Sequence, residues 1–206
     1  MARLNVNPTR MELKKLKTRL ATAVRGHKLL KDKSDEMIRR FSVILREDAA
    51  LRREVEKELA ETLTQFSVAR SVTPAYSAET AFAMPSVAVS AECATKSIMG
   101  VDVPEIELKE EKRSDTLPYS FSEITSEADY SVGRISALLP RLIKLAETEK
   151  AVRLLADEIE RNKRRVNALE YIMIPQLEET IKYIRDKLDE NERAAIVRLM
   201  KVKSKA

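Results

Sequence analysis

The sequence predicts an all-α fold, in which an N-terminal and a C-terminal helix form a long antiparallel two-helix coiled coil joined by a small central insert with a short β-hairpin. Two apolar stripes of similar length lie at the two ends of the chain, and helical periodicity disappears between them. Charged residues make up 34% of the 206 residues and aromatic residues 4%, which is typical of long helices. We therefore expect three parts: a coiled-coil helix over 1–70, the insert over 71–130 and a second coiled-coil helix over 131–206.

The first helix has a recognisable start. Asn7 can cap it, Pro8 suits the first helical position, and Thr9 with Glu12 offers an alternative capping box. The helix should begin near residue 8.

An apolar seam follows, with residues spaced alternately by three and four. Ten of its thirteen positions from 13 to 55 are apolar, the exceptions being His27, Ser34 and Asp48. The apolar members are Leu13, Leu16, Leu20, Ala23, Leu30, Met37, Phe41, Ile44, Leu51 and Val55, and a shifted stripe continues through Leu59, Leu63 and Phe66. The shift suggests a stutter or a wider partner.

A second seam of similar length occupies the C-terminal part. It runs through Leu142, Leu145, Val152, Leu155, Ile159, Val166, Leu169, Met173, Leu177, Ile181, Ile184, Leu188, Ala195 and Leu199. Because the insert can reverse the chain, each stripe is expected to cover the other, which brings the termini together. The alternative is a parallel homodimer, in which the insert would not reverse the chain.

Two prolines interrupt the second helix. Pro140 fits within its first turns, whereas Pro175 lies in the middle of the seam. Proline lacks a backbone donor and its ring collides with the preceding turn, so Pro175 should bend the helix.

The central insert has strand-like sequence around a glycine. Residues 86–91 alternate weakly, and residues 98–108 resemble a strand whose regularity Gly100 and Pro104 limit. The hairpin is centred on Ile98, Met99, Gly100, Val101, Val103 and Pro104. We expect residues 109–130 to form a loop and the second helix to begin between Ser122 and Pro140.

Charge is distributed unevenly along the chain. Residues 10–40 hold 11 Lys and Arg against 4 Asp and Glu, and residues 134–206 hold 17 against 12. Residues 71–130 are acidic, with 4 against 11. The basic runs contain interspersed acidic residues and no interleaved aromatic residues, which favours an ordinary solvated helix face first, a protein partner second and nucleic acid last.

Residue patterns for catalysis are missing. The sequence has no glycine-rich phosphate loop, no nucleophile elbow and no clustered His and Cys ligands. His27 lies at a seam position, which fits a packing role better than catalysis or metal binding. Cys93 lies among small residues, and we expect it to be neither a nucleophile nor a metal ligand. We expect no catalytic residue, no metal and no cofactor. No apolar run is long enough for a membrane span, so we expect a cytoplasmic protein without direct membrane insertion.

Four blocks of sequence are more specific. They are Asn7–Leu13 (NPTRMEL), Arg25–Lys33 (RGHKLLKDK), Ser97–Pro104 (SIMGVDVP) and Arg164–Glu170 (RRVNALE). The last block continues through Pro175, Thr180, Ile181 and Leu188–Glu190 to Arg193. In this order, and over nearly the whole chain, they resemble the D subunit of V-type and archaeal A-type ATPases, in its bacterial or archaeal form.

The resemblance implies a non-catalytic central stalk rotor. In that family the terminal coiled coil enters the cavity of the catalytic hexamer of A and B subunits, and the middle region meets the F and C subunits of the central stalk. The chain would transmit torque between ATP hydrolysis or synthesis in the hexamer and proton or sodium translocation in the membrane ring. It would be peripheral to the membrane, within the soluble sector. The alternative is a coiled-coil scaffold protein unrelated to ATPases.

We selected candidate residues for contact with the hexamer by their charge and their position in the sequence. Basic residues near the two termini could meet acidic loops that line the cavity, and exposed ion pairs of about 0–1 kcal/mol each would permit sliding. The candidates are Arg10, Lys14, Lys17, Arg25, Lys28, Lys201 and Lys203.

Overall fold

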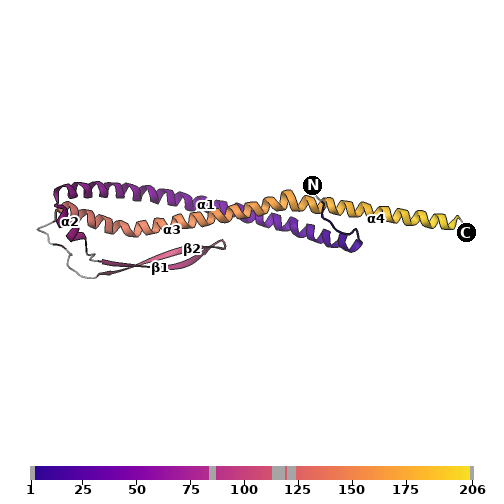
Figure 1. Cartoon of the computed structure of the whole chain (residues 1–206), viewed down its shortest axis with the longest axis horizontal. Coiled ribbons are helices and arrows are strands. Elements are labelled where there is room, and N and C mark those ends of the chain that lie inside the picture. Colours follow the sequence, from indigo (N-terminus) through magenta and orange to yellow (C-terminus); the bar gives the residue numbers. More distant parts are fainter. Residues whose placement is uncertain (1–2, 84–86, 113–118, 120–123, 205–206) are drawn as a thin grey trace. The chain divides into compact units, whose positions relative to one another are not determined.

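The computed structural model describes residues 3–83, 87–112, 119 and 124–204. Its elements are α1 (Arg10–Val72), α2 (Ala75–Phe82), β1 (Val87–Ile98), β2 (Val101–Lys112), α3 (Ser126–Ala168), the π-helical turn η1 (Leu169–Met173) and α4 (Ile174–Lys203) (Figure 1). The predicted architecture is confirmed: a long helix lies at each end of the chain, and a two-stranded antiparallel hairpin lies between them. The chain forms two compact units, one of Met1–Ile38 with Ile159–Ala206 and one of Arg39–Glu158.

The helices pair within one chain and run antiparallel. In the first unit, the side chain of Arg10 pairs with Glu192, His27 with Glu170, and Met37 with Asn162. In the second, Asp48 pairs with Thr148, Glu58 with Arg141, and Glu61 with Arg134. As the residue number rises on α1, its partner's number falls. The parallel homodimer is therefore not the arrangement that the structure shows.

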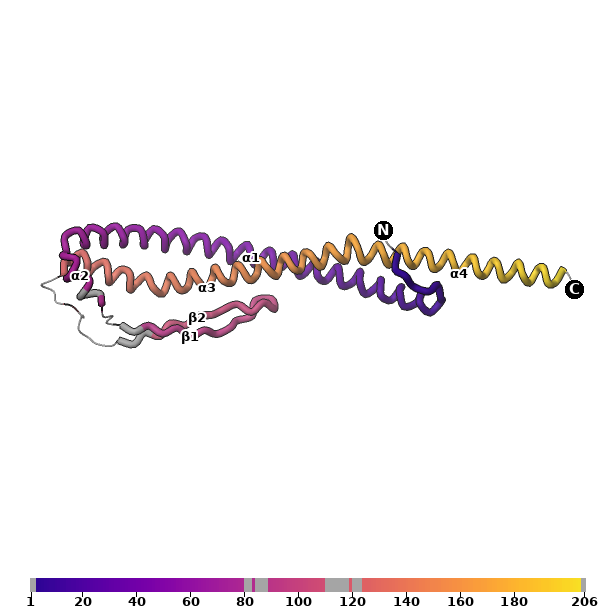
Figure 2. Tube along the Cα trace, viewed as in Figure 1, coloured from indigo at the N-terminus to yellow at the C-terminus, as the bar shows by residue number. Residues whose placement is uncertain are grey.

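Thr9 caps the start of α1. Its hydroxyl oxygen accepts a hydrogen bond of 3.2 Å from the backbone N–H of Glu12. Thr9 is therefore the N-cap, and the helix begins at Arg10. The preceding segment turns back along α4 (Figure 2). There the backbone N–H of Leu4 donates to the Thr180 hydroxyl at 3.2 Å, and the Arg3 guanidinium lies 4.4 Å from the centre of the Tyr183 ring.

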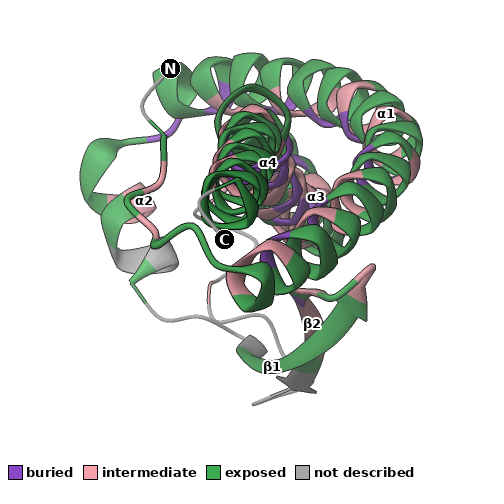
Figure 3. Cartoon of the chain, turned by 90° about the vertical axis from the view of Figure 1, so that its right-hand side faces the viewer, coloured by how far each residue is buried: buried purple, intermediate pink, exposed green. Residues whose placement is uncertain are grey.

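The core of the first unit consists of seam residues of α1 and α4. Leu16, Ala23, Leu177, Ile181 and Ile184 are buried together. Figure 3 shows the buried residues on the inner faces of the long helices and exposed residues on their outer faces. This one-sided burial is what the apolar stripes predict, since a helix of this length gains most of its stability from packing.

Two of the polar interruptions in the first seam are also buried. Ser34 and Asp48 are each 8% exposed. A buried carboxylate needs a donor, and Asp48 accepts a hydrogen bond of 2.8 Å from the Thr148 hydroxyl. The three-and-four spacing thus identified the inward positions even where the residue is polar.

The prediction was wrong for Leu63, which is 49% exposed. Thr62 takes the inward position instead and is buried. Its hydroxyl donates to the Glu58 carbonyl at 2.7 Å, so a polar side chain is tolerated there.

The prediction was also wrong for Met173, because η1 adds one residue to a helical turn. The backbone N–H of Ile174 donates to the carbonyl of Leu169, five residues earlier. Ile174 therefore packs against the core together with Leu169, and Met173 is turned outward to 39% exposure. Pro175 follows directly, at the start of α4, whereas Pro140 lies inside α3.

The hairpin is longer than the sequence predicted, because β2 continues to Lys112, into the segment that was expected to be a loop. Ile98 pairs with Val101 across a two-residue turn. Both turn residues have positive φ, 54° at Met99 and 83° at Gly100, as a type I′ turn requires.

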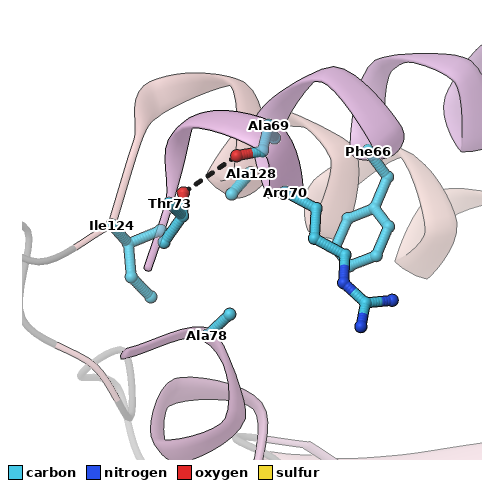
Figure 4. Close-up of a pocket in the computed structure, with 7 residues that line it drawn as sticks. All are labelled: Phe66, Ala69, Arg70, Thr73, Ala78, Ile124 and Ala128. Carbon is cyan, nitrogen blue, oxygen red and sulfur yellow. Dashed lines mark hydrogen bonds between the residues drawn. The ribbon is translucent and has the colours of Figure 1, made fainter. Parts of the chain in front are cut away.

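A small apolar contact lies at the junction of α1, α2 and α3 (Figure 4). A cavity of about 10 Å³ there is lined by Phe66, Ala69, Arg70, Thr73, Ala78, Ile124 and Ala128. A cavity of this size holds at most about one water molecule, so it is packing space and not a ligand site.

A polar contact lies near the start of α3. The Tyr119 hydroxyl donates to the Asp129 carboxylate at 2.5 Å. Partial burial of the phenol is the larger cause and this hydrogen bond the smaller one, and together they raise the pKa of Tyr119 to about 12.

Candidate functional site

All seven predicted contact residues are exposed: Arg10, Lys14, Lys17, Arg25 and Lys28 on α1, and Lys201 and Lys203 on α4. Arg10 forms an ion pair with Glu192 of the same chain. Among the described residues, the other six have no carboxylate within ion-pairing distance. Their charge is therefore available to a partner, whereas that of Arg10 is shared within the chain.

The last part of α4 carries apolar side chains that nothing in the described chain covers. Ile196, Val197, Leu199, Met200 and Val202 are all exposed, Leu199 to 70%. The seam prediction was therefore wrong for Ala195 and Leu199, which are not buried. The reason is that α1 begins at Arg10, beside Glu192, so α4 has no helix to pair with beyond that point. We call residues 193–203 the tip.

A second exposed apolar surface lies at η1. Tyr171, Ile172 and Met173 point outward, with Ile172 56% exposed. Beside them is a pocket of about 180 Å³ lined by Leu4, Arg19, Ala168, Ile172, Met173, Gln176 and Leu177. This surface was not predicted from the sequence, because the three-and-four spacing placed Met173 in the seam.

His27 links α1 to η1. Its Nε2 lies 3.4 Å from a carboxylate oxygen of Glu170, and the imidazole is only 20% exposed. The predicted packing role agrees with this position, since the imidazole is mostly buried and lies beside Glu170 on the opposite helix.

The hairpin residues named from the sequence surround the turn. Ile98 ends β1, Met99 and Gly100 form the turn, and Val101 begins β2. Val103 is 3% exposed, which leaves it the most buried side chain of the hairpin's described residues. Cys93 lies on β1 and is exposed.

The described residues offer neither a metal centre nor a membrane span. They contain no group of three or more His, Cys, Asp or Glu side chains placed to hold a metal ion. Within the same residues, no helix is long and apolar enough to cross a membrane.

The described fold and surfaces define a class of protein: an intramolecular antiparallel coiled coil whose exposed basic and apolar surfaces suit contacts with other proteins. The profile of the family described as the ATP synthase D subunit matches residues 12–204. The V-type ATP synthase D subunit of Thermoanaerobacter sp. (strain X514) is 50% identical over 203 residues, which cover 98% of this chain and 97% of that protein.

Two clostridial proteins are equally similar. The V-type ATP synthase D subunit of Clostridium novyi (strain NT) is 51% identical over 207 residues, covering 99% of this chain and 96% of that protein. The protein of the same name from Clostridium botulinum (strain Kyoto / Type A2) is 50% identical over 205 residues, covering 98% and 95%. The chain belongs to the family of ATP synthase D subunits and is a subunit of a V/A-type ATPase.

Proposed function

We propose that this chain is the central stalk rotor of its ATPase. It transmits torque between ATP hydrolysis or synthesis in the catalytic hexamer of A and B subunits and proton or sodium translocation in the membrane ring. It contributes no catalytic residue and works as a peripheral part of the soluble sector. The proposal rests on family membership and on one structural observation, the uncovered tip of α4.

The tip is the strongest structural support for the rotor proposal, because its composition suits an apolar bearing surface. Five large apolar side chains near the end of α4 are not covered by any residue that the structure describes, which is costly unless a partner encloses them. Lys201 and Lys203 lie in the same turns, where a basic residue is also favoured by the negative end of the helix dipole. A cavity with apolar walls and an acidic rim would match both features.

The basic residues along α1 support the same placement. Lys14, Lys17, Arg25 and Lys28 are exposed and have no ion-pair partner among the described residues, so they can meet acidic loops of the A and B subunits. Exposed pairs of this kind are worth about 0–1 kcal/mol each, so they guide a rotating shaft without fixing it in one position.

The paired helices give the chain the stiffness that torque requires. Twisting one helix against the other would expose the packed residues of the seam, such as Leu177 and Ile184, which lose contacts when separated. The central part, with the acidic insert and its hairpin, is left for the F and C subunits. The hairpin around Gly100 is our candidate for the contact with these two subunits.

Reconstitution tests the proposal. The chain is mixed with the A, B and F subunits of the same organism, and assembly and ATP hydrolysis are measured. One copy should enter for every three A and three B subunits, and turnover should be sustained. Self-association without entry into the hexamer would refute the rotor role.

A shortened chain tests the role of the tip separately. Ending the chain after Glu192 removes only residues that add nothing to the described core, so its stability should change little. The same change should weaken assembly with the hexamer. A shortened chain that assembles and turns over like the full chain would show that the tip is not the bearing.

A further inference from the structure

The pocket beside η1 has the size of a binding site for one side chain. Its volume of about 180 Å³ is smaller than the roughly 300–1,000 Å³ of typical small-molecule sites. Leu4, Ile172, Met173 and Leu177 make its lining mainly apolar. A single large apolar side chain from another protein fits these properties better than a metabolite does.

Arg19 gives the pocket a charge preference. It lines the pocket, is exposed, and forms no ion pair with any residue that the structure describes. A guanidinium beside an apolar cavity is suited to a two-pronged hydrogen bond with a carboxylate. The occupant should therefore present Asp or Glu close to its apolar side chain.

The surrounding charge disfavours a second copy of this chain as the occupant. Residues 10–40 carry 11 basic against 4 acidic residues, so two copies meeting here would bring like charges together. The exposed Tyr171 beside the pocket adds a residue type that is common at the centre of protein interfaces. The features together favour a protein partner with an acidic surface.

We propose that this pocket is a second docking site for the catalytic hexamer, separate from the tip. A large apolar side chain of a surrounding subunit enters it, and a neighbouring carboxylate of that subunit pairs with Arg19. The inference rests on the proposed rotor function, because only a chain inside the hexamer has such a neighbour. The site depends on the π-helical turn, which directs Ile172 and Met173 outward.

Photo-crosslinking in the reconstituted complex tests this site. A benzophenone amino acid replaces Ile172 in one sample and Leu199 in another. Both positions are exposed, so the fold should tolerate the probe. We expect the probe at Ile172 to crosslink to a hexamer peptide in which a large apolar residue lies next to Asp or Glu.

The probe at Leu199 separates the two proposals. Crosslinking from Leu199 but not from Ile172 would refute the pocket inference and leave the rotor function in place. Crosslinking from Ile172 only to this chain's own N-terminal segment would likewise refute it. Absence of crosslinks from both positions would overturn the rotor function, and the pocket inference with it.

Charge reversal gives an independent readout. Arg19→Glu should weaken binding of the chain to the hexamer about tenfold or more, because the partner's carboxylate would face a like charge. Lys31→Glu is the matched control, with the same change of charge on the same helix at a position that does not line the pocket. Equal effects of the two variants would mean that only net charge matters and would exclude a specific role of Arg19.

Discussion

The π-helical turn offers a sharp test of how the chain accommodates Pro175. Deleting Met173 shortens the five-residue step from Leu169 to Ile174 to four residues, which an ordinary α-helix spans while keeping both residues on the seam. The substitution Pro175→Ala can then be compared in the full chain and in the chain that lacks Met173.

The two backgrounds should respond differently. In the present structure Pro175 lies in the first turn of α4, after η1, where its missing N–H is not required. Pro175→Ala should therefore change the free energy of unfolding by no more than about 0.5–1 kcal/mol in the full chain. In the deletion background the proline lies inside a continuous α-helix, so the same substitution should stabilise by about 3 kcal/mol. For a chain of this length that corresponds to roughly 6–12 °C in Tm.

Urea unfolding followed by circular dichroism measures all four proteins of this cycle. The control deletes Glu178, an exposed residue of α4. This deletion rotates Ile181 and Ile184 away from the core and should be far more damaging than loss of Met173 from η1. If Pro175→Ala has the same effect in both backgrounds, the π-helical turn does not accommodate the proline and the reasoning fails.

Three further predictions follow from burial and local geometry. Leu177→Ala, at a fully buried core position, should cost about 2–5 kcal/mol of unfolding free energy, whereas Leu199→Ala at the exposed tip should stay within about 0.5 kcal/mol, and equal losses would contradict the assigned core. Gly26→Ala should raise the free energy of unfolding by about 0.5–1 kcal/mol, because the added Cβ meets no atom within 4 Å in a helix that glycine weakens; a loss in urea unfolding would contradict this. The pKa of Tyr119 is raised from 10.0 to about 12, so its contribution to stability is complete below pH 10 and is lost as pH rises through 12, and Tyr119→Phe should remove that dependence in alkaline unfolding curves.

The sequence was sufficient for the helical pairing because an α-helical seam has a fixed period. The spacing of three and four located inward positions well enough that the polar Ser34 and Asp48 proved buried. What it could not supply was the local partner of each polar group. The hydrogen bond from Thr148 that makes Asp48 tolerable depends on the pairing of two segments 100 residues apart.

The missed surfaces have two distinct physical causes. Met173 was misplaced because regular steps of three and four residues were assumed, and a π-helical turn breaks that regularity without leaving a gap in the apolar pattern. Leu199 was misplaced because apolar spacing shows which face could pack, but not where the opposite helix ends. The Thr9 cap fixes that end on α1, so the cap was the signal that could have marked the tip.

The same inserted residue connects the packing of the chain with its proposed second docking site. The π-helical turn keeps Leu169 and Leu177 on the core side, and by doing so it forces Met173 out to line the pocket. A chain that lacks Met173 and carries Pro175→Ala should therefore be well folded but have a closed or altered pocket. If that chain is as stable as the native chain and still binds the hexamer with unchanged affinity, the turn serves packing alone. Weaker binding at unchanged stability would mean that the turn is retained for the surface it creates.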